Sequence, residues 1–149
     1  MHFNFFALAL TGLAAGAAAQ SGFCPEASRF GGVSVSPSTI SPGDTFTVTA
    51  NLTCAVELGN TPTFLDYYID GTATHTISGP ILVARRTFDA SGPPIDKFDA
   101  VLPDWFYFTD ATYSLRMENS FAREGPSGDK VITVGGLSTG IQITGIESN

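Results

Sequence analysis

The strongest pattern of hydrophobic and polar positions in the chain is a ten-residue alternation from Thr45 to Cys54. One side carries Phe46, Val48, Ala50, Leu52 and Cys54; the other carries four threonines and Asn51. A period of two predicts a β-strand with one buried face. The Ser-Pro-Gly-Asp sequence at 41–44 supplies turn residues just before it. The pattern therefore predicts a strand over 45–54, entered through a tight turn.

Further short segments rich in β-branched and aromatic residues follow, separated by Gly, Pro and Asn. They are 33–36, 64–69, 72–77, 81–88, 95–102, 113–117, 130–134 and 140–146. Asp70-Gly71 is typical of a two-residue hairpin turn and predicts that 72–77 returns beside 64–69. No stretch keeps helical apolar spacing over two turns without Gly or Pro. We therefore predict an all-β, antiparallel sandwich of about eight strands, like immunoglobulin or fibronectin III domains.

The segment from Asp110 to Leu115 supports this prediction. It resembles the start of the sixth strand of immunoglobulin-type domains, where a tyrosine hydroxyl bonds back to the backbone at the corner between the sheets. Tyr113 would be that corner tyrosine, and Leu115 would be buried in the core. The alternative is an ordinary strand with one inward tyrosine.

The first nineteen residues have the character of a secretory signal peptide. A short apolar run ends in Ala17-Ala18-Ala19, so we expect cleavage before Gln20. We expect residues 20–149 to form a single domain. No later run is hydrophobic enough for an anchor, which predicts a secreted, extracellular protein without a membrane anchor.

Secretion sets the expected covalent chemistry. Cys24 and Cys54 are the two cysteines, and an isolated pair in an oxidising compartment predicts one disulfide. A structural role is favoured over a redox role because the chain has no Cys-x-x-Cys motif. Asn51-Leu52-Thr53 is a sequon for N-glycosylation, which makes Asn51 the expected glycosylation site.

The charge balance narrows the possible partners. Fourteen Asp and Glu against seven Lys and Arg give a net charge of −7. This disfavours nucleic acids and anionic membranes, which need a basic surface. The simple interpretation of the charge is that it keeps the protein soluble.

Candidate chemistry is sparse. If the 70–71 turn were regular, Asp66 would lie opposite His75, giving an Asp-His relay or, as favoured, a surface pair of little energetic value. Asp96 and Asp99 could contribute to a weak calcium site, but no calcium-loop motif accompanies them. The predicted mature N-terminus is Gln20 rather than histidine, which disfavours a copper oxygenase. We predict no catalytic residues, no metal and no cofactor.

The most unusual stretch is Pro103-Asp-Trp-Phe-Tyr-Phe-Thr109. In a strand, Trp105 and Tyr107 would share one side. Exposed Trp and Tyr are common anchors for protein partners and platforms for sugar rings, so both are candidate binding residues. The alternative is that the segment plugs one end of the sandwich.

The segment 33–48, together with Thr87-Phe88, 98–103 and 113–115, resembles small secreted fungal proteins, and most closely the necrosis-inducing secreted effectors of plant-associated fungi. The resemblance implies a non-enzymatic protein that binds a host protein such as an immune receptor kinase. Two alternatives remain: a module that binds cell-wall polysaccharide through Trp105 and Tyr107, and a hydrolase built on His75 and Asp66.

Overall fold

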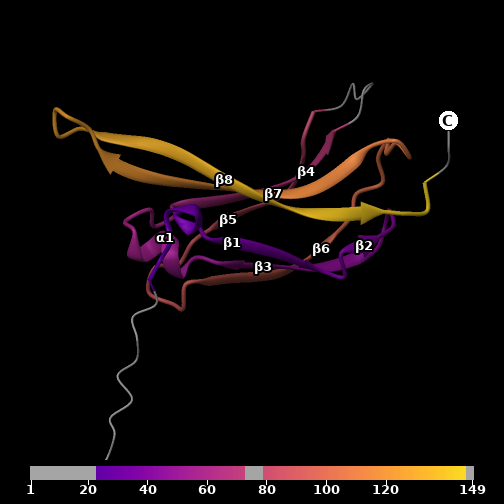
Figure 1. The fold of residues 1–149 in the computed structure, drawn as a ribbon, viewed down its shortest axis with the longest axis horizontal. Coiled ribbons are helices and arrows are strands. Elements are labelled where there is room, and N and C mark those ends of the chain that lie inside the picture. Colours follow the sequence, from indigo (N-terminus) through magenta and orange to yellow (C-terminus); the bar gives the residue numbers. More distant parts are fainter. Residues whose placement is uncertain (1–22, 73–78, 147–149) are drawn as a thin grey trace, which may run out of the picture.

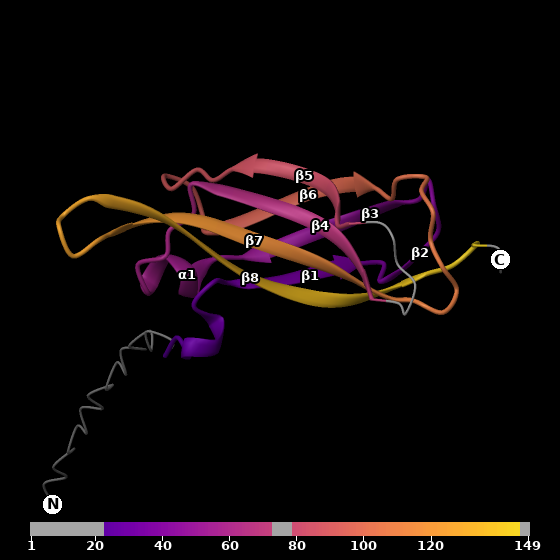
Figure 2. The same cartoon turned by 90° about the horizontal axis from the view of Figure 1, so that it is seen from above.

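Two β-sheets packed face to face form the domain in the computed structural model, which describes residues 23–72 and 79–146 (Figures 1 and 2). The smaller sheet has the order β1 (Gly32–Ser36), β3 (Thr45–Asn51), β6 (Ile95–Val101). The larger sheet has the order β2 (Thr39–Ile40), β8 (Lys130–Ile143), β7 (Thr112–Glu124), β4 (Phe64–Thr72), β5 (Ile81–Thr87). Two short helices, η1 (Glu26–Ser28) and α1 (Thr53–Glu57), lie at one end. In these described parts no helix is long and apolar enough to cross a membrane.

The strand order confirms the predicted fold class. Strands β1, β3 and β6 occupy the places of immunoglobulin strands A, B and E, and β4, β7 and β8 those of C, F and G. Strand β5 extends the second sheet as in variable-type domains. The described pairings are antiparallel except that β2 runs parallel to β8, with Thr39 opposite Gln142.

The alternation along β3 is the inner face of the sandwich, as predicted. Phe46, Val48 and Ala50 are fully buried while their threonine neighbours face outward. The opposing sheet contributes alternate residues of β4 and β7 to the same core, namely Leu65, Tyr67, Ile69, Tyr113, Leu115 and Met117. Burial of such side chains stabilises each by about 1.5–3 kcal/mol.

The predicted strand 45–54 is three residues too long. Strand β3 ends at Asn51, whose Oδ1 accepts a hydrogen bond from the Thr53 backbone N–H at 3.0 Å. This Asx turn competes with the sheet ladder and redirects the chain. Residues 53–57 then form α1, a helix that the alternation did not predict.

The predicted turn at Asp70-Gly71 is wrong. Strand β4 continues through both residues to Thr72, pairing them with Ser114 and Tyr113 of β7. Glycine is required here for another reason: a Cβ on Gly71 would lie 2.8 Å from Cε1 of Tyr113. The predicted return strand 72–77 falls almost entirely outside the described residues. The predicted strands 130–134 and 140–146 are one strand, β8.

The corner tyrosine is confirmed. The Phe108 backbone N–H donates to Tyr113 Oη at 2.6 Å, and that hydroxyl lies 3.3 Å from the Phe108 carbonyl oxygen. Leu115, two residues later, is fully buried.

Candidate interaction surface

The β7–β8 hairpin extends beyond the body of the sandwich, as Figure 1 shows at the left of the molecule. The alternating burial of β7 stops at Phe121, and the next three residues are exposed. On β8 all five residues from Lys130 to Val134 are exposed. They include three β-branched aliphatic residues: Val131, Ile132 and Val134 are 51%, 62% and 56% exposed. Three of the five residues from 130 to 134 are therefore aliphatic although water surrounds them.

The base of the arm is fixed by packing and hydrogen bonds. The Phe30 ring stacks against Phe121 with a centroid separation of 6.0 Å. The same ring occupies the space beside Gly135, where a Cβ would lie 2.2 Å from it. Arg123 donates from Nη2 to Oδ1 of the buried Asn60 at 2.5 Å. These contacts hold the hairpin in one orientation relative to the sandwich.

The outer edge of β8 is open along most of its length. Strand β7 pairs with one edge from Lys130 to Ile141. On the other edge, β2 pairs only with Gln142 and Ile143, and no other described strand pairs there. Natural edge strands are usually protected by proline, bulges or inward charges. Residues 131–141 contain neither proline nor charge.

On the outer face of the large sheet, next to this edge, side chains that are cross-strand neighbours form rows. One row is mainly apolar and the next row is charged. Phe64, Ser120 and Val134 are cross-strand neighbours in the apolar row, and Phe64 is also exposed. The next row in register consists of Arg85, Asp66, Glu118 and Gly136, from β5 to β8. Arg85 binds both carboxylate oxygens of Asp66, at 2.6 and 2.7 Å. Glu118 is bonded to Arg116, which also binds Asp70.

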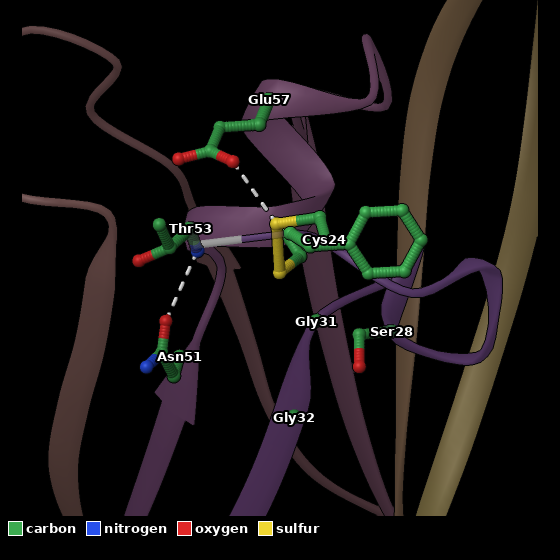
Figure 3. A pocket seen from close by; sticks show the side chains of 9 residues that line it. Cys24, Ser28, Gly31, Gly32, Asn51, Thr53 and Glu57 are labelled. Atoms are coloured by element: carbon green, nitrogen blue, oxygen red, sulfur yellow. Dashed lines mark hydrogen bonds between the residues drawn. A yellow bond between two sulfur atoms is a disulfide. The ribbon is translucent and has the colours of Figure 1, made fainter. Parts of the chain in front are cut away.

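The predicted disulfide is present: Cys24 and Cys54 are bonded. It ties the segment before η1 to α1, beside the end of β3 (Figure 3). Asn51, the predicted glycosylation site, is exposed next to it.

The predicted aromatic platform does not form. Residues 102–108 are not a strand, so Trp105 and Tyr107 do not share a face. Trp105 is 51% exposed, but Tyr107 is buried and donates its hydroxyl to the Pro103 carbonyl at 2.9 Å. Burial raises the pKa of Tyr107 to about 12, with smaller contributions from Tyr113 and Asp104. Tyr107 plugs the sandwich, as the alternative interpretation had it, and Phe106 is exposed instead.

The carboxylates considered for catalysis and metal binding have structural partners. Asp66 pairs with Arg85 across β4 and β5, while His75 lies outside the described residues. Asp96 faces the interior, where it accepts hydrogen bonds from Tyr67 Oη and Arg86 Nε. Burial and the nearby Asp96 carboxylate raise the pKa of Tyr67. Asp99 faces outward to Thr47. Asp96 and Asp99 lie on opposite faces of β6, so they cannot share a calcium ion.

The sequence predicted a strand at 130–134 but not its exposure. An apolar strand has the same composition in the centre of a sheet and at its edge. The exposure could have been inferred from one feature: residues 130–134 do not alternate between apolar and polar positions. A hairpin that projects from the sandwich buries neither of its faces, so it does not need such an alternation.

Comparisons with known proteins give no family. No family model matches the chain, and no curated protein matches it. Two similar solved structures are both a superoxide reductase (neelaredoxin) from Ignicoccus hospitalis. The first is 11% identical, with a TM-score of 0.46, and covers 76% of this chain and 80% of that one. The second is a variant of that protein, 12% identical, with a TM-score of 0.43 and coverages of 75% and 79%.

These findings correct the prediction of a non-enzymatic fungal effector. Both similar structures are enzymes, and no effector family appears among the matches. The effector function and its carbohydrate-binding alternative are withdrawn. The likeness is too distant to carry the reductase activity over to this chain. Within residues 23–72 and 79–146, no three His, Cys, Asp or Glu side chains gather as metal ligands do.

Proposed function

We propose that this chain is a self-assembling domain that forms a symmetric dimer by pairing the open edges of two β8 strands. The observation that carries the proposal is the open edge beside Val131, Ile132 and Val134, which are all exposed on a firmly held hairpin. An edge of this kind offers unpaired backbone groups to another strand. Pairing would also remove apolar surface from water, which contributes about 25 cal/mol per Å².

The alternation of faces selects the register of the pairing. Successive side chains of β8 point to opposite faces. When two copies of β8 pair antiparallel, their outer faces therefore lie on the same side only if each even-numbered residue opposes an even-numbered residue of the second copy. Placing Thr133 opposite Thr133 of the second copy puts Ile132 opposite Val134 twice, so that four aliphatic side chains form one cluster. A shift of two residues would instead place Lys130 against Val134, or Gly136 against Ile132.

The charged row supports the same register. Lys130 of the second copy would lie opposite Gly136, next to Glu118. The row would then run from Arg85 through Asp66, Glu118 and Gly136 to that lysine. Asp66 and Glu118 already bind Arg85 and Arg116, so the lysine would be a third cation beside these two carboxylates. The Cα atoms of Lys130 and Glu118 would be two strand spacings apart, about 10 Å, which the two long side chains can span.

The test is sedimentation of the wild type and of Val134→Lys over roughly micromolar to millimolar concentrations. We expect the wild type to dimerise and Val134→Lys to remain monomeric, because a lysine on the edge cannot be buried against Ile132. Val101→Lys is the matched control, since Val101 is 55% exposed on β6. It should dimerise like the wild type. A monomeric wild type, or equal loss in both variants, would refute the proposal.

A further inference from the structure

A cavity of about 380 Å³ opens beside Asn51, at the end of the molecule that holds the disulfide (Figure 3). Its floor is bare backbone at Gly31 and Gly32; Gly32 is the cross-strand neighbour of Asn51. No atom lies within 4 Å of the place where a Cβ on Gly32 would stand. The cavity therefore has room directly next to the asparagine side chain.

The Asn51 amide is oriented for modification without loss of its existing bond. Its Oδ1 holds the Thr53 N–H at 3.0 Å. In Figure 3 the amide nitrogen lies on the side away from Thr53. No described hydrogen bond uses Nδ2, so a substituent there would leave the Asx turn intact.

We propose that Asn51 carries an N-linked glycan whose first N-acetylglucosamine packs into this cavity. In the transfer, Asn51 Nδ2 attacks C1 of the sugar in a lipid diphosphate-linked oligosaccharide. The N–C1 bond forms, the C1–O bond to the diphosphate breaks, Nδ2 loses one proton and the lipid diphosphate leaves. Leu52 is fully buried in the fold and its N–H donates to Pro94 O, so transfer precedes folding.

The cavity walls match the chemistry of that sugar. Phe23 is 91% exposed, and its ring offers an apolar surface for the face of a pyranose. Glu57, on the opposite element α1, has a carboxylate oxygen 3.0 Å from Cys24 Sγ and can accept a hydrogen bond from a hydroxyl or the acetamido N–H. A volume near the lower limit of ligand pockets suits one ring rather than a longer oligosaccharide.

The test uses the full chain secreted from a eukaryotic host, with its glycan trimmed enzymatically to one N-acetylglucosamine. Intact mass should show occupancy at Asn51, absent in Asn51→Gln and in Thr53→Ala. The trimmed protein should melt about 3 °C above Thr53→Ala, which lacks the glycan but keeps the Asn51 side chain and its hydrogen bond from the backbone N–H of residue 53. Phe23→Ala should abolish that difference, and Phe106→Ala, which removes an exposed ring elsewhere, should preserve it.

Two results would overturn the proposal. An unmodified Asn51 in the secreted wild type would show that the sequon is not used. An occupied Asn51 whose thermal gain survives Phe23→Ala would show that the sugar does not pack into the cavity.

Discussion

Tyr113 shows how much one hydroxyl contributes to this sandwich. It bonds both backbone groups of Phe108 and thereby holds the irregular segment 102–111 against the large sheet. Its ring packs edge-on against Tyr107, with centroids 5.5 Å apart.

Tyr113→Phe keeps the ring and removes only the hydroxyl. We expect it to lower the free energy of unfolding by about 1–3 kcal/mol, because the Phe108 N–H loses its partner. Urea denaturation followed by fluorescence measures this, with an unchanged m-value showing that the fold is kept. An unchanged midpoint would mean that water replaces the hydroxyl without cost.

Residues with local signatures were predictable from the sequence. Tyr113 was recognised by its spacing to Leu115, and Cys24 and Cys54 by being the only pair available. Tyr107 was misplaced because four aromatics in a row look the same in a strand and in a plug. What decides between them is the hydrogen bond to Pro103 and the position of Tyr113, both of which depend on the folded chain.

At the scale of elements, the β7–β8 hairpin contains two glycines at which the sequence pattern predicted the end of a strand. Gly135-Gly136 divided the predicted strands 130–134 and 140–146, yet β8 passes through both residues. Glycine inside a strand often marks a close approach. Phe30 fills the space beside Gly135, and the Met117 carbonyl would lie 3.0 Å from a Cβ on Gly136.

Gly135→Ala should therefore destabilise the protein by about 1–3 kcal/mol, since the Phe30 ring must move to admit the methyl group. Gly140→Ala is the matched control on the same strand, because no atom lies within 4 Å of its Cβ position. It should be neutral or slightly stabilising. Thermal unfolding of both variants tests this, and an equal effect in both would show that Phe30 yields freely.

The alternation of apolar and polar residues predicted most of the strands correctly, but it did not predict where they end. The ladder along β3 stops at the Asx turn of Asn51, and β4 runs on past Asp70-Gly71 because β7 is long enough to pair with it. Both outcomes depend on which partner the backbone finds. A single sequence window does not contain that information.

On the scale of the whole molecule, the two proposed surfaces belong to different sheets. Asn51 lies on the outer face of the small sheet, at the end of β3. The proposed dimer would use the free edge of β8, in the large sheet. A glycan on one and a second copy on the other would occupy separate surfaces of the same molecule. A net charge of −7 on each copy opposes association, so the pairing depends on the short apolar edge.

In the proposed dimer a two-fold axis passes beside residue 133, so one cysteine substituted into the chain can test the register. Thr133→Cys would place each new thiol opposite its own counterpart, at a Cα separation of about 4.5–5.5 Å, which a disulfide can bridge. Val131→Cys would lie opposite Gly135 of the second copy. Its two thiols would be separated by about 14 Å, beyond the reach of a disulfide. The native cysteines are already bonded to each other and do not compete.

Under mild oxidation we expect Thr133→Cys to give a covalent dimer on a non-reducing gel, and Val131→Cys to remain monomeric. Denaturant added before oxidation should abolish the cross-link, because the strands must be folded to align the thiols. Equal cross-linking of both variants would indicate random collision rather than pairing. Preferential cross-linking at Val131 would place the two-fold axis elsewhere on β8 and would break the match of Lys130 with Glu118.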